Sequence, residues 1–239
     1  MPSEIRIGLI GDFNERQKAH TAIPKALAAA SEGTADAVWV PTDSIGKGES
    51  LMEFHGIWCV PGMPYRNANG VLTAIRHARV TRTPFLGTSA GFQYVFIEFA
   101  RNVLGLSDAD HQKSNPKAAI PIISPLDAAL AGVHARVHFH DGTHLRKAYR
   151  APDSIEEYHC SFGLNRRYKR LLEGAQLYIA AVDDDHEVRA VEMDGHPFFV
   201  ATLFQPEMHS HDSSAHSPLV HAFVAACHKH RMAATRAAS

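Results

Sequence analysis

The first hundred residues alternate between short apolar runs and longer segments with helical periodicity. Four apolar runs predict buried strands at Ile5–Ile10, Ala37–Val40, Ile57–Val60 and Pro84–Gly87. The segments between and after them predict helices at Gln17–Ala30, Ala68–Val80 and Phe92–Leu104. Pro24 lies inside the first of these helices and is expected to kink it or to move its start. Alternating strands and helices predict an α/β fold, with a mainly parallel central sheet and helices on both faces.

The pattern changes after Ile120, where strand-like segments follow one another. These segments are His134–His140, Leu177–Ala181, Arg189–Met193 and Phe198–Phe204. They are expected to extend the sheet or to form an antiparallel flank. Ser217–His230 predicts a closing helix. Because no repeat or linker divides the chain, we predict one domain over residues 1–232 and a frayed, disordered tail over residues 233–239.

Composition and charge exclude several classes of function. The chain has 239 residues, 45% of them hydrophobic, and a formal net charge of -1, which provides no global field for nucleic acid or anionic lipid. Its three cysteines, Cys59, Cys160 and Cys227, form no CxxC pair, as expected in a reducing compartment. The sequence has no signal-peptide pattern and no apolar run of membrane-spanning length. We therefore expect a cytoplasmic protein that binds neither nucleic acid nor membranes.

A nucleophile elbow is predicted where the fourth strand ends. Residues Gly87–Gly91 (GTSAG) match the G-x-S-x-G pattern, in which small flanking residues allow a sharp strand-to-helix turn. Ser89 is the candidate nucleophile, and the Ala90 N–H is expected to point into an oxyanion hole at the helix N-terminus. Gly62 and Met63 follow the third strand, and the Met63 N–H is the candidate second donor. A tight turn with an incidental serine is the structural alternative.

Long segments resemble a known family. Residues 56–106 (GIWCVPGMPYRNANGVLTAIRHARVTRTPFLGTSAGFQYVFIEFARNVLGL) and 196–219 (HPFFVATLFQPEMHSHDSSAHSPL) are similar to the class I glutamine amidotransferase domain of the CTP synthase type. Gly142–Tyr149 and Tyr158–Asn165 also match segments of this family. The similarity covers nearly the whole chain, from about Ile5 to Cys227. We expect no synthetase domain that would use the ammonia, so a separate synthetase-type partner or a homodimer is a candidate assembly.

The resemblance implies an altered catalytic triad. The family's elbow nucleophile is a cysteine, and Ser89 stands in its place. The family's general base is a histidine before Pro-Glu, and Gln205 stands there, followed by the orienting carboxylate Glu207. Glutamine does not accept and return a proton at neutral pH. A serine hydroxyl needs a base more than a thiol does, so the two replacements together remove the usual proton relay.

Substrate recognition is altered as well. Aligned to the family, Lys113 replaces the glutamate that holds the substrate's amino group, and Ser161 replaces the arginine that holds its carboxylate. A lysine repels an ammonium group, and a serine cannot form a bidentate pair with a carboxylate. Gln93 matches another substrate-contacting position and is retained. We therefore do not expect free L-glutamine to be the substrate.

Other groups are candidates to restore catalysis. His209 and His159 are the candidate replacement bases, and Cys160 is a further candidate nucleophile or pocket residue. Ser-Ala-Gly at the elbow also resembles peptidase E and cyanophycinase, which use a serine with a histidine from another strand. Each of these residues also has a simpler interpretation, as a surface histidine or a packing cysteine. The histidines His209, His211, His216 and His221, with Asp212, suggest either a loop-borne zinc site or a solvated loop, and we predict no metal and no cofactor.

Two hypotheses of function remain. The leading one is a divergent amide or ester hydrolase, or an amide-transfer enzyme, that uses Ser89 with the Ala90 and Met63 oxyanion donors. Its substrate would be a small amide, an ester or a masked glutamine derivative. The alternative is a catalytically inactive protein of the same fold that binds a small molecule or regulates a partner enzyme.

Overall fold

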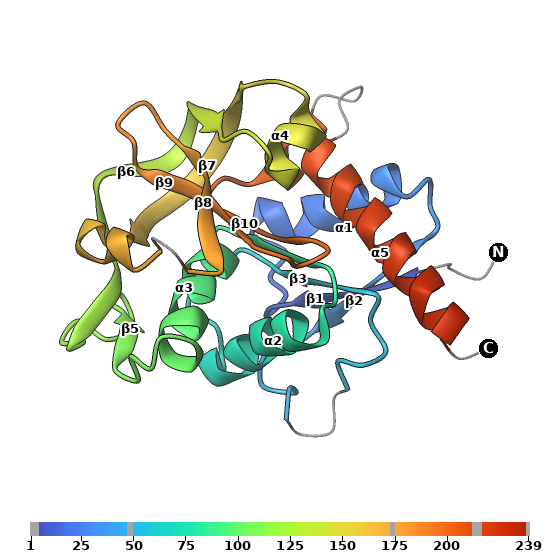
Figure 1. Cartoon of the computed structure of the whole chain (residues 1–239), viewed down its shortest axis with the longest axis horizontal. Helices are drawn as coiled ribbons and strands as arrows, with labels where there is room; N and C mark the ends of the chain where they lie inside the picture. Colours follow the sequence, from blue (N-terminus) through green and yellow to red (C-terminus); the bar gives the residue numbers. More distant parts are fainter. Residues whose placement is uncertain (1–4, 47–49, 173–174, 212–216, 238–239) are drawn as a thin grey trace.

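The chain folds around one ten-stranded sheet. The computed structural model describes residues 5–46, 50–172, 175–211 and 217–237. Its strands are β1 (Ile5–Ile10), β2 (Ala35–Val40), β3 (Gly56–Cys59), β4 (Phe85–Thr88), β5 (Ala109–His111), β6 (Ile120–Phe139), β7 (Asp153–Leu164), β8 (Leu177–Val182), β9 (Val188–Met193) and β10 (Phe199–Thr202). They are arranged in the order β2-β1-β3-β4-β10-β9-β8-β6-β5, and β7 also pairs with β6. This sheet and the helices that cover it confirm the predicted α/β fold class (Figure 1).

The parallel half of the sheet contains β2, β1, β3, β4 and β10. β1, β3, β4 and β10 are almost entirely buried, which explains why they appear in the sequence as continuous apolar runs. Because β3, β4 and β10 run in the same direction, their carboxyl ends meet at one edge of the sheet. The residues that follow these strands therefore lie together, although they are far apart in the sequence.

Two pairs of helices cover this half. α1 (Lys18–Ala30) packs against α5 (Pro218–Ala237), and α2 (Ala68–Thr81) packs against α3 (Ala90–Asn102). Figure 1 shows these pairs on opposite sides of the parallel strands. α5 lies so close to β3 that a Cβ on Gly56 would be 2.2 Å from the Cys227 Sγ. α1 begins one residue after the predicted start and continues through Pro24.

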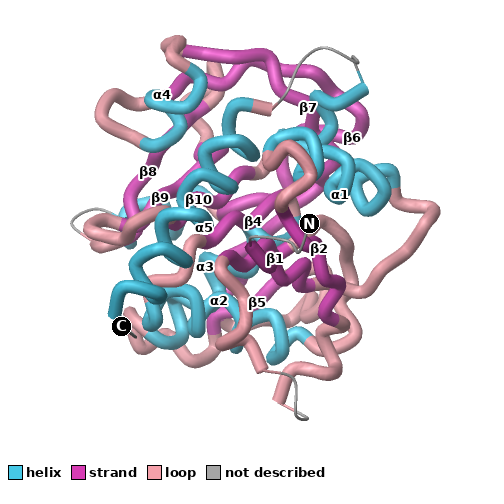
Figure 2. The backbone as a smooth tube through the Cα atoms, turned by 90° about the vertical axis from the view of Figure 1, so that its right-hand side faces the viewer, coloured by secondary structure: helices cyan, strands magenta, loops and turns pink. Residues whose placement is uncertain are grey.

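The second half is the antiparallel flank that the sequence allowed. β10, β9, β8 and β6 follow one another antiparallel, and β6 forms a long ladder with β7 (Figure 2). The predicted strand His134–His140 covers only residues 134–139 of the 20-residue β6, and the sequence missed β5, β7 and the short helix α4 (His144–Tyr149). Much of the β6–β7 ladder is exposed, so its residues carry little of the apolar alternation that indicates a strand.

The C-terminal segment differs from its prediction. α5 continues to Ala237, through most of the segment that was expected to be a frayed tail, because the alanines there have high helix propensity. Residues 238 and 239 lie outside the described residues. In the part of the chain that the structure describes, no helix is both long and apolar enough to cross a membrane.

The contact between α3 and β3 gives a test of the fold. A Cβ on Gly91 would be 2.2 Å from the carbonyl oxygen of Cys59. We expect Gly91→Ala to lower the free energy of unfolding by about 3 kcal/mol in urea denaturation, because backbone must move to accept the methyl group. Gly105→Ala is the control. Its Cβ would have no atom within 4 Å, and its positive φ of 71° should cost about 1 kcal/mol. Equal losses in the two variants would contradict the close approach.

Candidate functional site

Ser89 occupies a strained turn between β4 and α3. Its φ and ψ are 54° and −103°, a conformation that residues other than glycine rarely adopt. The turn is held by a hydrogen bond from the Ser89 N–H to the Thr202 carbonyl (2.9 Å) and by one from the Gln93 N–H to the Ser89 carbonyl (3.2 Å). Ser89 is only 7% exposed. These features have the geometry of a nucleophile elbow, as the G-x-S-x-G pattern predicted.

The candidate oxyanion loop follows β3. Gly62 has a φ of 128°, so a side chain at this position would be strained. The buried His20 holds the loop. Its Nδ1 accepts a hydrogen bond from the Asn14 N–H (3.0 Å), so its Nε2 carries the proton and donates to the Pro61 carbonyl (2.6 Å). Burial lowers the pKa of His20, which keeps the ring neutral. His20 is not among the predicted site residues, although a histidine on the apolar face of a helix was a possible signal.

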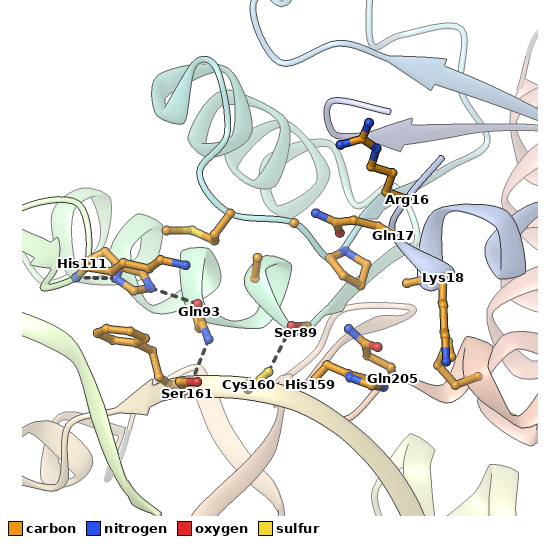
Figure 3. A pocket seen from close by; sticks show the side chains of 18 residues that line it. Arg16, Gln17, Lys18, Ser89, Gln93, His111, His159, Cys160, Ser161 and Gln205 are labelled. Carbon is orange, nitrogen blue, oxygen red and sulfur yellow. Dashed lines mark hydrogen bonds between the residues drawn. The ribbon is translucent and has the colours of Figure 1, made fainter. Parts of the chain in front are cut away.

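A cavity of about 460 Å³ lies between the elbow and this loop (Figure 3). It brings together residues from the loop before α1, the loops after β3 and β10, the start of α3, and β5 and β7. Of the predicted site residues, those that line it are Gly62, Met63, Ser89, Ala90, Gln93, Lys113, His159, Cys160, Ser161 and Gln205. Glu207 and His209 do not line it. Residues that line the cavity but were not predicted include Arg16, Gln17, Lys18 and His111.

The hydroxyl of Ser89 hydrogen-bonds to a thiol. Ser89 Oγ lies 3.0 Å from Cys160 Sγ, which is also 3.4 Å from the Leu203 carbonyl (Figure 3). Burial raises the pKa of Cys160 to about 11, so the thiol is protonated at neutral pH. A protonated thiol is not a general base for the serine.

Gln205 lies beside Ser89, and Glu207 lies deeper. Gln205 is buried, and its backbone N–H donates to the Glu157 carbonyl (2.9 Å). Glu207 is 0% exposed, and burial raises its pKa to about 8. A hydrogen bond with the Thr88 hydroxyl opposes this effect in part, because it lowers the pKa. The Thr88 hydroxyl also accepts the indole N–H of Trp58 (3.0 Å), so its proton is directed to another acceptor. At neutral pH the Glu207 carboxyl is mostly protonated.

The two candidate histidine bases have different surroundings. His209 Nε2 lies 2.8 Å from the fully buried carboxylate of Glu156, and this hydrogen bond raises the pKa of His209. His209 is therefore engaged away from the cavity. His159 does line the cavity, and its Nε2 lies 2.6 Å from Glu157 Oε1. Because neighbouring strand residues point to opposite faces, Cys160 rather than His159 is the β7 residue that contacts Ser89.

His111 orients Gln93. The Lys113 N–H donates to His111 Nδ1 (3.1 Å), so His111 Nε2 donates to Gln93 Oε1 (2.9 Å), and Gln93 Nε2 donates to the Phe162 carbonyl (2.8 Å). Burial, with the nearby Lys113 charge, lowers the pKa of His111 to about 4. The neutral ring thereby holds the Gln93 amide in one orientation. Nothing in the local sequence pattern indicated this role for His111.

The histidine-rich segment gives no metal site in the described residues. His216 and Asp212 lie outside them. Within residues 5–46, 50–172, 175–211 and 217–237, no group of three or more histidine, cysteine, aspartate or glutamate side chains is placed to hold a metal ion.

Comparison with solved structures shows the fold. The glutaminase domain of Trypanosoma brucei CTPS with bound acivicin has a TM-score of 0.84 to this chain and 24% identity, and the match covers 94% of each chain. A glutamine amidotransferase from Thermotoga maritima has a TM-score of 0.57 and 11% identity, covering 95% of this chain and 97% of that one. These similarities show the fold of a glutamine amidotransferase.

Sequence comparison shows the family. The family model described as "Glutamine amidotransferase class-I" matches residues 21–225. The CTP synthase of Sulfolobus acidocaldarius is 30% identical over 223 residues, 87% of this chain and 42% of that protein. The CTP synthase of Methanopyrus kandleri is 32% identical over 236 residues, 91% of this chain and 44% of that protein. The chain belongs to the class I glutamine amidotransferase family, and it spans less than half the length of these two relatives.

The buried Glu207 predicts a dependence of stability on pH. Its pKa is about 8 in the folded chain against an ordinary value of 4.5, so the folded state favours the proton. The resulting stability is complete below pH 4.5 and is lost as pH rises through about 8. The free energy of unfolding in urea should fall by up to about 1.4 kcal/mol per pH unit in this window. Glu207→Gln should remove this slope and be more stable than wild type at pH 9.

The pair of His209 and Glu156 adds a slope of the same sign, since the pKa of His209 is also raised. The difference between wild type and Glu207→Gln therefore isolates Glu207. Parallel pH profiles for the two proteins would show that Glu207 is ionised in the folded state.

Proposed function

We propose that this chain is a class I amidotransferase-fold protein whose elbow cavity binds a small molecule without hydrolysing glutamine. The observation that carries the proposal is the hydrogen bond of 3.0 Å between Ser89 Oγ and Cys160 Sγ. A serine becomes a nucleophile when a base accepts its proton, and the pKa of about 11 makes Cys160 a protonated neighbour instead.

The surroundings of the elbow support the same conclusion. Gln205 stands where the family has its histidine and cannot relay a proton. Glu207, which would orient that histidine, is a mostly neutral carboxyl at pH 7 because burial raises its pKa to about 8. The triad therefore differs from that of the family in the charge of its carboxyl group as well as in its residues.

In this proposal the cavity also lacks the two charged groups with which the family binds glutamine. Lys113 and Ser161 line the cavity in place of the family's glutamate and arginine. An ammonium group beside Lys113 would be repelled, and Ser161 has no charge to offer a carboxylate. Gln93 is retained, but its amide is held by His111 and Phe162. These residues suit a ligand with charges different from those of free glutamine.

A fluorophosphonate probe tests the proposal directly. We expect intact-mass analysis to show no labelling of the folded protein at Ser89 over hours, since no base activates the hydroxyl. In parallel, a bound ligand should raise the melting temperature of wild type and of Ser89→Ala alike. Stoichiometric labelling at Ser89, absent from Ser89→Ala, would overturn the proposal.

One observation favours a second candidate, a serine hydrolase. His159 and Glu157 form a histidine–carboxylate pair, with 2.6 Å between Nε2 and Oε1, at the wall of the cavity. For His159 to replace Cys160 beside Ser89, β7 would have to shift by one residue against β6, and this shift would assemble a Ser-His-Glu arrangement. The substrate would be a small amide or ester.

Paired histidine substitutions test this second candidate. If Ser89 hydrolyses amides or esters with His159 as base, His159→Gln should lower kcat/KM by at least about 10²-fold. His209→Gln is the matched control, and it should leave turnover unchanged because His209 faces Glu156. Hydrolysis of nitrophenyl esters is the measurement. Equal effects of the two substitutions, or none, would exclude His159 as the base.

Partners and location are also part of the proposal. The named relatives are CTP synthases more than twice the length of the matched segment. A separate synthetase-type partner, a homodimer and a cytoplasmic location are consistent with this similarity, and pull-down and sedimentation measurements would test them.

A further inference from the structure

The elbow cavity is lined by cations without acids. Arg16, Lys18 and Lys113 line it, together with His111 and His159, and none of its lining residues is an aspartate or a glutamate. The whole chain has a formal net charge of -1, so this excess of positive charge is local. A cleft lined by one sign of charge concentrates the field and attracts ligands of the opposite sign.

Two carboxylates near the cavity are already paired. Glu157 lies 2.6 Å from His159 Nε2, and Asp110 lies 3.4 Å from an Arg101 nitrogen. Among the ion pairs of the described residues, Arg16, Lys18 and Lys113 have none. Their charges are therefore available to a ligand.

The cations lie on both sides of the elbow. Figure 3 shows Arg16 and Lys18 on one side of Ser89 and His111 on the other. Lys113 belongs to the His111 side, because its backbone N–H donates to the His111 ring and its charge helps to lower the pKa of His111. Between them, the N-terminus of the 13-residue α3 adds a partial positive charge beside Ser89.

From this arrangement we infer that the cavity binds a small organic molecule with at least two acidic groups, one held by Lys113 and one by Arg16 and Lys18. Carboxylate and phosphate groups share this chemistry. The inference rests on the proposed function, because it names the ligand class of the same cavity. It accounts for Lys113, which would repel the ammonium group of glutamine and attracts an acidic group instead.

The test is binding to the Ser89→Ala variant, in which turnover by the elbow is removed. Glutarate and 3-phosphoglycerate are the probes with two acidic groups, and glutaramide is the neutral analogue of glutarate. We expect millimolar glutarate or 3-phosphoglycerate to raise the melting temperature while glutaramide does not, and the affinity by calorimetry to fall as salt rises. Preference for one of the two acidic probes distinguishes carboxylate from phosphate as the second acidic group.

A matched pair of double variants separates the cavity from general charge. Arg16→Gln with Lys113→Gln should weaken binding of the preferred acidic probe by at least about tenfold. Arg76→Gln with Lys117→Gln removes two exposed cations that do not line the cavity, and it should leave the affinity unchanged. The inference is overturned if glutaramide binds as well as glutarate, if both double variants weaken binding equally, or if neither acidic probe binds. None of these results bears on labelling of Ser89, so the proposed function is tested separately.

Discussion

The close approach of α3 to β3 is the constraint on which the site depends. The backbone of Gly91 lies against the Cys59 carbonyl so closely that a methyl group has no room. This contact allows the chain to turn sharply at Ser89 and to keep its strained dihedral angles, at a cost of order 1–3 kcal/mol that the packed core offsets. The same contact sets the N-terminus of α3 beside the loop after β3. This one backbone contact therefore places the elbow beside the candidate oxyanion loop.

Burial decides the charge of Glu207 in the interior behind the elbow. In a histidine-containing triad an imidazolium can stabilise a buried carboxylate. Here Gln205 supplies no charge, so Glu207 remains in an apolar interior with Glu156 nearby, and the proton is retained. Glu156 in turn has His209 as its partner. The two acids are therefore accommodated in different ways, one by an ion pair and one by protonation, and neither leaves an ionised group directed at Ser89.

The sequence predicted much of the fold because buried parallel strands are continuous apolar runs, as in Ile5–Ile10. It also predicted the elbow, because Gly87–Gly91 is a local pattern. It did not predict β7 or most of β6, whose residues pair through backbone hydrogen bonds and are largely exposed. His20 and His111 were missed for a different reason. Each histidine holds a partner that is distant in the sequence, and its role depends on which ring nitrogen carries the proton. The spacing of residues in a sequence contains no information on either feature.

The three cysteines differ in their access to the cavity. Cys59 and Cys227 are sealed in the core, the latter beneath the contact of α5 with Gly56, and burial raises the pKa of both. Cys160 borders the cavity beside Ser89. An alkylating reagent small enough to enter the cavity would therefore meet a single thiol, and the raised pKa of Cys160 would make its alkylation slow at neutral pH. A ligand in the cavity would shield that thiol, so protection of Cys160 from alkylation in alkaline solution would report that the cavity is occupied, with no introduced label.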